Sequence, residues 1–117
     1  MKSKVIAKAG LVGVIMSLSL SLTAQALPTS QVVFAKGSYC GSYTGDLSKG
    51  RVFKVSLGAN QELVINTDGH VQSVKDSKGR RLADHGDSDY RYYTRSKGEH
   101  RITMVGSGFS SAEFCAY

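Results

Sequence analysis

Short runs of strand-type residues, each ended by Gly, Asn or Asp, follow one another from residue 31 to residue 117. In the clearest run, apolar Phe53, Val55 and Leu57 alternate with polar Lys54 and Ser56. An alternation with a period of two places the apolar side chains on one face of a strand. Such runs recur roughly every ten residues, a spacing that favours an antiparallel sandwich or a closed barrel.

The turn residues between the runs define the expected strands. A pair of residues, Asp68-Gly69, predicts a hairpin, because both residue types accept the positive φ angles of a tight primed turn. The runs are too short and irregular for an eight-stranded cup. We therefore predict an all-β fold, a small, jelly-roll-like antiparallel β-sandwich with eight or nine short strands. The expected strands cover residues 31–35, 39–44, 51–57, 62–66, 70–75, 80–83, 89–95, 99–105 and 111–117.

The first 26 residues have the pattern of a secretory signal peptide. Three lysines precede an apolar stretch from Ala9 to about Leu22, and small residues stand at Ala24 and Ala26. The apolar stretch is short for a bilayer span, although a retained membrane anchor is the alternative interpretation. We expect cleavage after Ala26, export to the periplasm or beyond, no membrane attachment afterwards, and one domain over residues 27–117.

The charge of the expected mature chain is modest. Three of the fifteen Lys and Arg residues precede residue 27, so twelve basic and nine acidic residues remain, a net charge of +3. A nucleic-acid-binding protein concentrates basic charge on one face. Here the charges of both signs are interleaved, so we expect solvated surface and no nucleic-acid partner. The interleaved residues are Lys54, Asp68, Lys75, Asp76, Lys78, Arg80, Arg81, Asp84 and Asp87.

The only two cysteines are Cys40 and Cys115. In an oxidising compartment, two cysteines in a small domain favour a disulfide, while two free buried thiols are the alternative. If Phe114 faces the core, the opposite parity of Cys115 places the disulfide on the outer face, where it ties the second expected strand to the last. Without CxxC spacing or clustered histidines, no zinc site is expected.

Catalytic chemistry finds little support in the sequence. The histidines His70, His85 and His100 stand in no recognisable arrangement with a nucleophile or a carboxylate. Both cysteines serve better as a crosslink than as a nucleophile. We therefore predict a protein without a catalytic site or a cofactor.

One acidic segment has oxygen ligands at alternating positions. Asp84, Asp87 and Asp89 resemble part of a calcium loop, but the twelve-residue spacing with a terminal Glu is missing. A hydrophilic connection between strands is the alternative. We keep these residues as a calcium candidate only.

The segment after it, residues 90–95, combines tyrosine and arginine. As a strand it places Arg91, Tyr93 and Arg95 on one face, with Tyr90, Tyr92 and Thr94 on the other. Tyr and Arg are favoured at binding hot spots, so the first face is a candidate protein or sugar contact. The alternative is an ordinary outer face on which Arg stems cover a Tyr ring.

Several short segments resemble a known family. Val-Phe-Ala-Lys-Gly at 33–37 and Tyr-Thr-Gly-Asp-Leu at 43–47 resemble the opening of the periplasmic inhibitors of g-type lysozyme. Phe-Lys-Val at 53–55, a Gly-x-x-Gln turn at 58–61 and Ser-Lys-Gly-Glu-His-Arg-Ile at 96–102 continue the resemblance. That family is similar to the pre-peptidase C-terminal β-sandwich, in which an Asp-x-x-Gly turn precedes a Leu, as at 76–79 and Leu82 here. The resemblance spans most of residues 31–117.

The resemblance implies a sandwich that plugs a lysozyme groove with loops from one end. In the family these loops, before the Phe53 strand and in the last hairpin, carry a Tyr and a pair of Arg. Here residues 48–51 lack the Tyr and residues 106–111 lack the Arg pair, so those residues do not carry over. Their nearest counterparts by position are Lys49, Arg51 and Phe109. A cationic plug suits a groove that holds a catalytic carboxylate.

We therefore expect an exported binding protein. The first hypothesis is inhibition of a g-type lysozyme, with Lys49 or Arg51 near the catalytic carboxylate. The second is a peptidoglycan- or carbohydrate-binding, or accessory envelope, module that uses Arg91, Tyr93 and Arg95. The third is a structural module stabilised by calcium.

Overall fold

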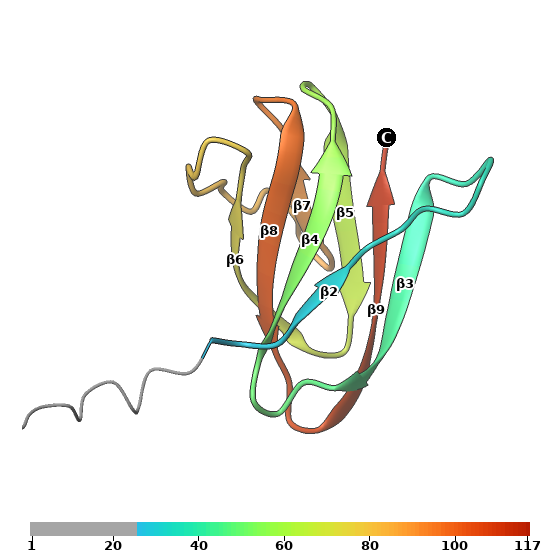
Figure 1. The fold of residues 1–117 in the computed structure, drawn as a ribbon, viewed down its shortest axis with the longest axis vertical. Coiled ribbons are helices and arrows are strands. Elements are labelled where there is room, and N and C mark those ends of the chain that lie inside the picture. Colours follow the sequence, from blue (N-terminus) through green and yellow to red (C-terminus); the bar gives the residue numbers. More distant parts are fainter. Residues whose placement is uncertain (1–25) are drawn as a thin grey trace, which may run out of the picture.

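A computed structural model describes residues 26–117, which form two stacked four-stranded sheets (Figure 1). The strand order is β2-β4-β8-β6 in the first sheet and β3-β9-β5-β7 in the second. The strands are β2 (Thr29–Gln31), β3 (Cys40–Asp46), β4 (Arg51–Leu57), β5 (Glu62–Thr67), β6 (His70–Lys75), β7 (Tyr90–Tyr93), β8 (Gly98–Val105) and β9 (Phe109–Ala116). The predicted all-β sandwich is confirmed. The predicted signal peptide, up to residue 25, lies outside the described residues.

Consecutive strands lie in opposite sheets along the whole described chain. Each connection therefore crosses from one sheet to the other, in the manner of a jelly roll, and every strand pairs with strands that are distant in sequence. Five neighbouring pairs are antiparallel, whereas β2 and β4 run parallel, which the sequence did not predict.

The predicted hairpin at Asp68-Gly69 is wrong, because β5 and β6 belong to different sheets. Neither residue is among those with a positive φ. The Asp68 carboxylate instead accepts a hydrogen bond from the Ser111 backbone N–H (3.0 Å), and the Thr67 hydroxyl accepts one from the Gly69 N–H (2.9 Å). The Thr67 hydroxyl also donates to Ser111 O (2.7 Å), so Thr67 and Asp68 both attach the turn to β9 at the point where the chain leaves the second sheet.

Two of the expected strands, 31–35 and 80–83, do not form regular strands over their predicted length but cover the core at the edges of the sheets. The run at 31–35 contributes only Gln31 to β2; beyond it, Val32 and Phe34 pack against the core beside β3. The run at 80–83 forms one isolated bridge, and Leu82 donates its N–H to Val74 O (2.9 Å) while its side chain is buried. Val32 and Phe34 of the first run and Leu82 of the second cover the core. Periodicity alone does not distinguish such residues from those of a paired strand.

The core lies between the two sheets, and aromatic rings occupy its centre. Phe53 contacts Tyr43 and Phe114, with ring centroids 4.9 and 5.0 Å apart. The alternation predicted for β4 is confirmed, since Val55 and Leu57 are buried on the same face. Burying a side chain of this size contributes roughly 1.5–3 kcal/mol.

The predicted disulfide joins Cys40 to Cys115, which face each other across the β3–β9 ladder. Phe114 points into the core, so the disulfide lies on the outer face of the second sheet, as expected. Cys115 is nevertheless buried and sits opposite Val64 of β5. The bond therefore fastens the edge strand β3 to the middle of its sheet.

Replacing both cysteines by serine should lower the free energy of unfolding by about 4 kcal/mol, because the bond spans 75 residues of chain. Urea denaturation of the double variant Cys40→Ser/Cys115→Ser beside the oxidised protein measures this difference. An unchanged denaturation midpoint would show that the β3–β9 ladder holds without the crosslink.

One carboxylate assigned to the surface is buried. Asp76 is 3% exposed, and its carboxylate accepts hydrogen bonds from the backbone N–H groups of Lys78 (3.0 Å) and Arg80 (2.9 Å) and from the Arg80 guanidinium (2.9 Å). Burial pushes the pKa of Asp76 upward, but these hydrogen bonds outweigh it and hold the pKa below its ordinary value of 3.8. Gly79 closes the turn with a φ of 79°.

This carboxylate should make stability depend on pH. A pKa lowered by folding stabilises the native state above pH 3.8, and that contribution is lost as pH falls through the folded value. Asp76→Asn should therefore melt at a lower temperature than the unaltered protein at pH 7, with the gap closing below about pH 4. The exposed Asp87→Asn is the control and should show no gap; equal gaps for both variants would contradict the assignment.

Candidate functional site

The β3–β4, β5–β6 and β8–β9 connections meet at one end of the sandwich, the lower end in Figure 1. The β3–β4 and β8–β9 connections are joined by two hydrogen bonds: Leu47 N–H donates to Gly108 O, and Gly106 N–H donates to Leu47 O, both at 2.9 Å. We call residues 47–50 and 106–109 the loop end. The Leu47 side chain is fully buried and attaches it to the core. The two loops that the family resemblance singled out thus lie side by side.

Local chemistry holds the β3–β4 connection in one shape. The Asp46 carboxylate accepts the Ser48 backbone N–H (2.8 Å), and this bond, with the nearby charge of Lys49, lowers the pKa of Asp46. Gly50 closes the turn with a φ of 84°, which an L side chain would strain. The tip is therefore a preformed turn that presents Lys49 to solvent.

The residues predicted at this end divide into two kinds. Lys49 is exposed and Phe109 is 78% exposed. Arg51 is half-buried: its Nη1 donates to Ser30 Oγ (2.9 Å), and its guanidinium carbon lies 5.3 Å from the Tyr43 ring centroid. Lys49 and Phe109 are thus free for a partner, while Arg51 also holds β2 to β3.

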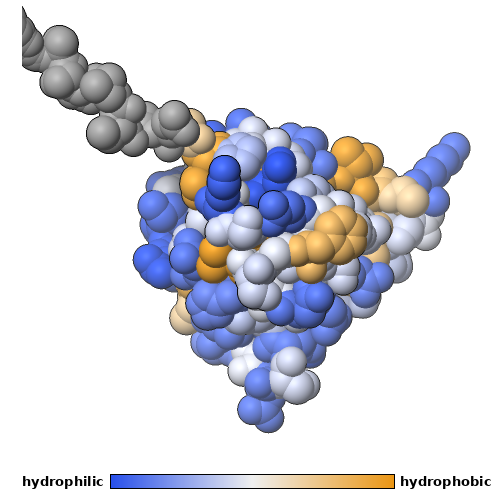
Figure 2. All heavy atoms as spheres, turned by 90° about the horizontal axis from the view of Figure 1, so that it is seen from below, coloured by the Kyte–Doolittle hydropathy of each residue, from blue (hydrophilic) through white to orange (hydrophobic). Residues whose placement is uncertain are grey.

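Figure 2 views the molecule from this end. Apolar side chains appear as separate patches set among hydrophilic ones. This surface is therefore mixed in character, with an exposed phenylalanine and an exposed lysine on neighbouring connections.

The Tyr-Thr-Gly-Asp-Leu segment that carries the family resemblance builds this end from inside. Tyr43 packs on Phe53, a side chain on Gly45 would collide with the Tyr43 ring, and Leu47 fills the end of the core. The residue types of this segment are therefore explained by packing inside the sandwich.

The tyrosine-rich strand β7 alternates as predicted, with Tyr92 buried and Tyr93 48% exposed. Arg91 donates to Glu62 (2.9 Å) and Asp89 (3.0 Å), and these bonds raise the pKa of its guanidinium. Arg95 follows the strand and is exposed. The charge of Arg91 is therefore already paired, and the predicted contact role of this face rests on Tyr93 and Arg95.

The three calcium candidates do not converge on one point. Asp84 Oδ1 accepts backbone N–H groups from Gly86 (2.8 Å) and Arg91 (2.9 Å), Asp89 pairs with Arg91, and Asp87 is exposed. Within residues 26–117, the potential ligand atoms gathered within 4.8 Å of one another belong to Cys40, Glu113 and Cys115, and both of these sulfurs are in the disulfide.

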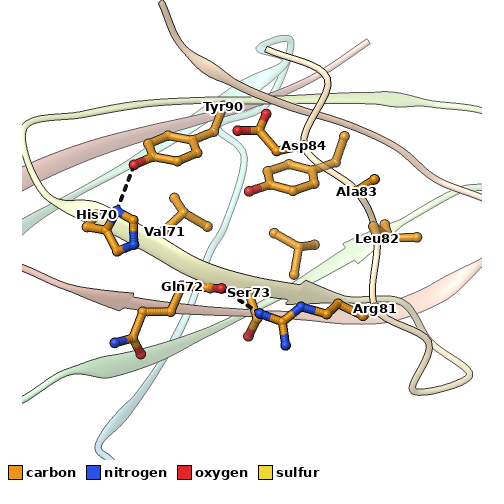
Figure 3. A pocket seen from close by; sticks show the side chains of 11 residues that line it. His70, Val71, Gln72, Ser73, Arg81, Leu82, Ala83, Asp84 and Tyr90 are labelled. Atoms are coloured by element: carbon orange, nitrogen blue, oxygen red, sulfur yellow. Dashed lines mark hydrogen bonds between the residues drawn. The ribbon is translucent and has the colours of Figure 1, made fainter. Parts of the chain in front are cut away.

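A pocket of about 520 Å³ opens on the side of the sandwich, between β6 of one sheet and β7 of the other (Figure 3). Its polar lining consists of His70, Gln72, Ser73, Arg81, Asp84, Tyr90 and Tyr92. Sequence reasoning missed this pocket. Its two walls come from β6 and β7, which lie close together only because of the sheet topology. No short sequence motif indicates that these two strands are neighbours.

The fold and these two features define a small β-sandwich with preformed loops at one end and a side pocket. No protein-family model and no curated protein matches the chain. Among solved structures it is similar to the periplasmic inhibitor of g-type lysozyme from Aeromonas hydrophila (15% identity, TM-score 0.67, 80% of this chain and 100% of that chain). It is also similar to the periplasmic inhibitor of g-type lysozyme from Salmonella Typhimurium (14% identity, TM-score 0.57, 79% of this chain and 100% of that chain).

The pre-peptidase C-terminal domain of a Bacillus anthracis collagenase is similar too (8% identity, TM-score 0.56, 81% of this chain and 100% of that chain). The chain therefore has the fold of the g-type lysozyme inhibitors, which this collagenase domain shares. The resemblance read from the sequence is confirmed for the fold. As for membranes, residues 26–117 contain no helix long and apolar enough to span one.

Proposed function

We propose that this protein is an exported inhibitor of a g-type lysozyme and that its loop end enters the substrate groove of the enzyme. The observation that carries the proposal is the hydrogen-bonded pair of connections that presents Lys49 and Phe109 from the loop end. The fold shared with two periplasmic inhibitors of g-type lysozyme supports it. The pattern of residues 1–26 supports export to the periplasm.

The physics of the loop end suits a groove. Loops that are already hydrogen-bonded lose little conformational freedom on binding, so more of the contact energy appears as affinity. Lys49 supplies a positive charge for the catalytic carboxylate of the enzyme, and Phe109 supplies an apolar surface to bury. The protein acts by occlusion, without a catalytic step or a cofactor of its own.

Lysozyme assays with purified protein test this proposal. A g-type enzyme should lose activity near one equivalent of inhibitor, and Lys49→Glu should weaken inhibition by at least about tenfold because it opposes two negative charges. Phe109→Ala should weaken it as well, with no change in melting temperature for either variant. Lys97→Glu is the matched control, since Lys97 is exposed next to the start of β8, at the opposite end of the sandwich.

Two results would contradict the proposal. One is full activity of g-, c- and i-type lysozymes at excess protein. The other is co-sedimentation with purified peptidoglycan while lysozyme rates stay unchanged, which would favour the wall-binding hypothesis.

Arg51→Ala should behave differently from Lys49→Glu. Because the guanidinium contacts both Ser30 and the Tyr43 ring, its loss should lower the melting temperature together with any loss of inhibition. Thermal melts beside the inhibition assay separate the two effects. Unchanged melting with weaker inhibition would assign Arg51 to direct contact with the enzyme.

A further inference from the structure

The side pocket between β6 and β7 has walls that are fixed in place. On the β6 side, Leu82 N–H donates to Val74 O (2.9 Å). On the β7 side, Arg91 N–H donates to the Asp84 carboxylate (2.9 Å), and His85 N–H donates to Arg91 O (2.7 Å). The segment between the strands is thus bonded to both sheet edges, so the pocket is preformed.

The pocket combines an apolar floor with a polar rim. Val71, Val74 and Leu82 are all buried and line it. Figure 3 shows His70 and Tyr90 on one side, joined by a hydrogen bond between the His70 Nδ1 and the Tyr90 hydroxyl (3.1 Å). A concave site of several hundred Å³ with an apolar lining and a few convergent polar groups is typical of small-ligand sites.

Tyr92, Arg81 and Asp84 are among the polar side chains of the lining that a ligand can reach. Tyr92 is 3% exposed, and its hydroxyl bonds to no other residue in the described part of the chain. Burial, together with Asp84 and Tyr90, raises the pKa of Tyr92 to about 12, so the hydroxyl remains a donor at neutral pH. Arg81 uses Nη2 for Gln72 O (2.9 Å), which leaves further N–H groups, and the bonds described above occupy only Oδ1 of Asp84.

These groups select the chemistry of the ligand. The opposite charges of Arg81 and Asp84 balance, so a neutral molecule fits better than an ion. It must offer acceptors to Arg81 and Tyr92, a donor to Asp84, and an apolar face to the floor. A sugar ring has this combination, with hydroxyl groups around its edge and C–H groups on its faces. We propose that the pocket binds a neutral pyranose of one or two rings.

This pocket is separate from the loop end and from the outer face of β7. The proposal of sugar binding therefore does not depend on whether the protein inhibits a lysozyme. A nuclear magnetic resonance titration of the purified protein tests it, with the disaccharide of N-acetylglucosamine, cellobiose and leucine as probes. Either disaccharide should cause saturable shifts of the amides in residues 71–74 and 82–84. Leucine, a zwitterion with an apolar side chain, should cause none.

Variants assign the binding to the pocket. Arg81→Ala should weaken disaccharide binding by about tenfold and Tyr92→Phe by about fivefold, since each removes hydrogen bonds to the sugar. Arg95→Ala is the matched control, because Arg95 lies outside the pocket lining, and it should bind as the unaltered protein does. Melting temperatures show that each variant is folded.

Three outcomes would overturn the proposal. The first is the absence of saturable shifts with both disaccharides. The second is sugar binding that Arg95→Ala weakens more than Arg81→Ala, which would move the site to the outer face of β7. The third is binding of leucine alone, which would assign the pocket to an amino acid or peptide.

Discussion

The burial of inward-facing side chains between two sheets is the constraint on which the rest of this structure depends. Because each strand from β2 to β8 is followed by a strand in the opposite sheet, no two of the described strands are joined by a short hairpin. Sheet pairing is entirely non-local and must be stabilised by contacts such as those of Phe53 with Tyr43 and Phe114. The disulfide strengthens the same arrangement at the edge strand β3.

The same topology places the surfaces that a partner meets. All connections between β2 and β9 cross from one sheet to the other, so they lie at the ends and sides of the sandwich. At one end they are hydrogen-bonded through Leu47 into a small, mixed surface with Lys49 and Phe109 exposed. At one side the long β6–β7 connection covers the core incompletely and leaves a pocket lined by Arg81 and Tyr92. The preformed loop end is suited to blocking the substrate groove of an enzyme, and the side pocket is suited to binding a small ligand.

Polar residues that serve as scaffolding here are easily mistaken for binding residues. Arg91 is paired with Glu62 and Asp89, and Asp84 accepts backbone N–H groups, although both stand in a segment that reads as a contact site. Asp76, read as solvated, is buried and organises its turn. Sequence position does not separate these cases, since the partners lie on other strands.

The sequence by itself determined the all-β class, the bounds of β4 and β6, the inward faces of β4 and β7, and the cysteine pair. The reason is that the two-residue alternation of buried side chains and the presence of two cysteines are visible in the sequence itself. The tertiary structure alone decided that Asp68-Gly69 crosses between sheets, that 31–35 and 80–83 cover the core, and that Arg51 is half-buried while Lys49 is free. These outcomes depend on which distant strands become neighbours. Local residue patterns do not encode that choice, because an apolar run gains the same burial energy in a sheet or against its edge.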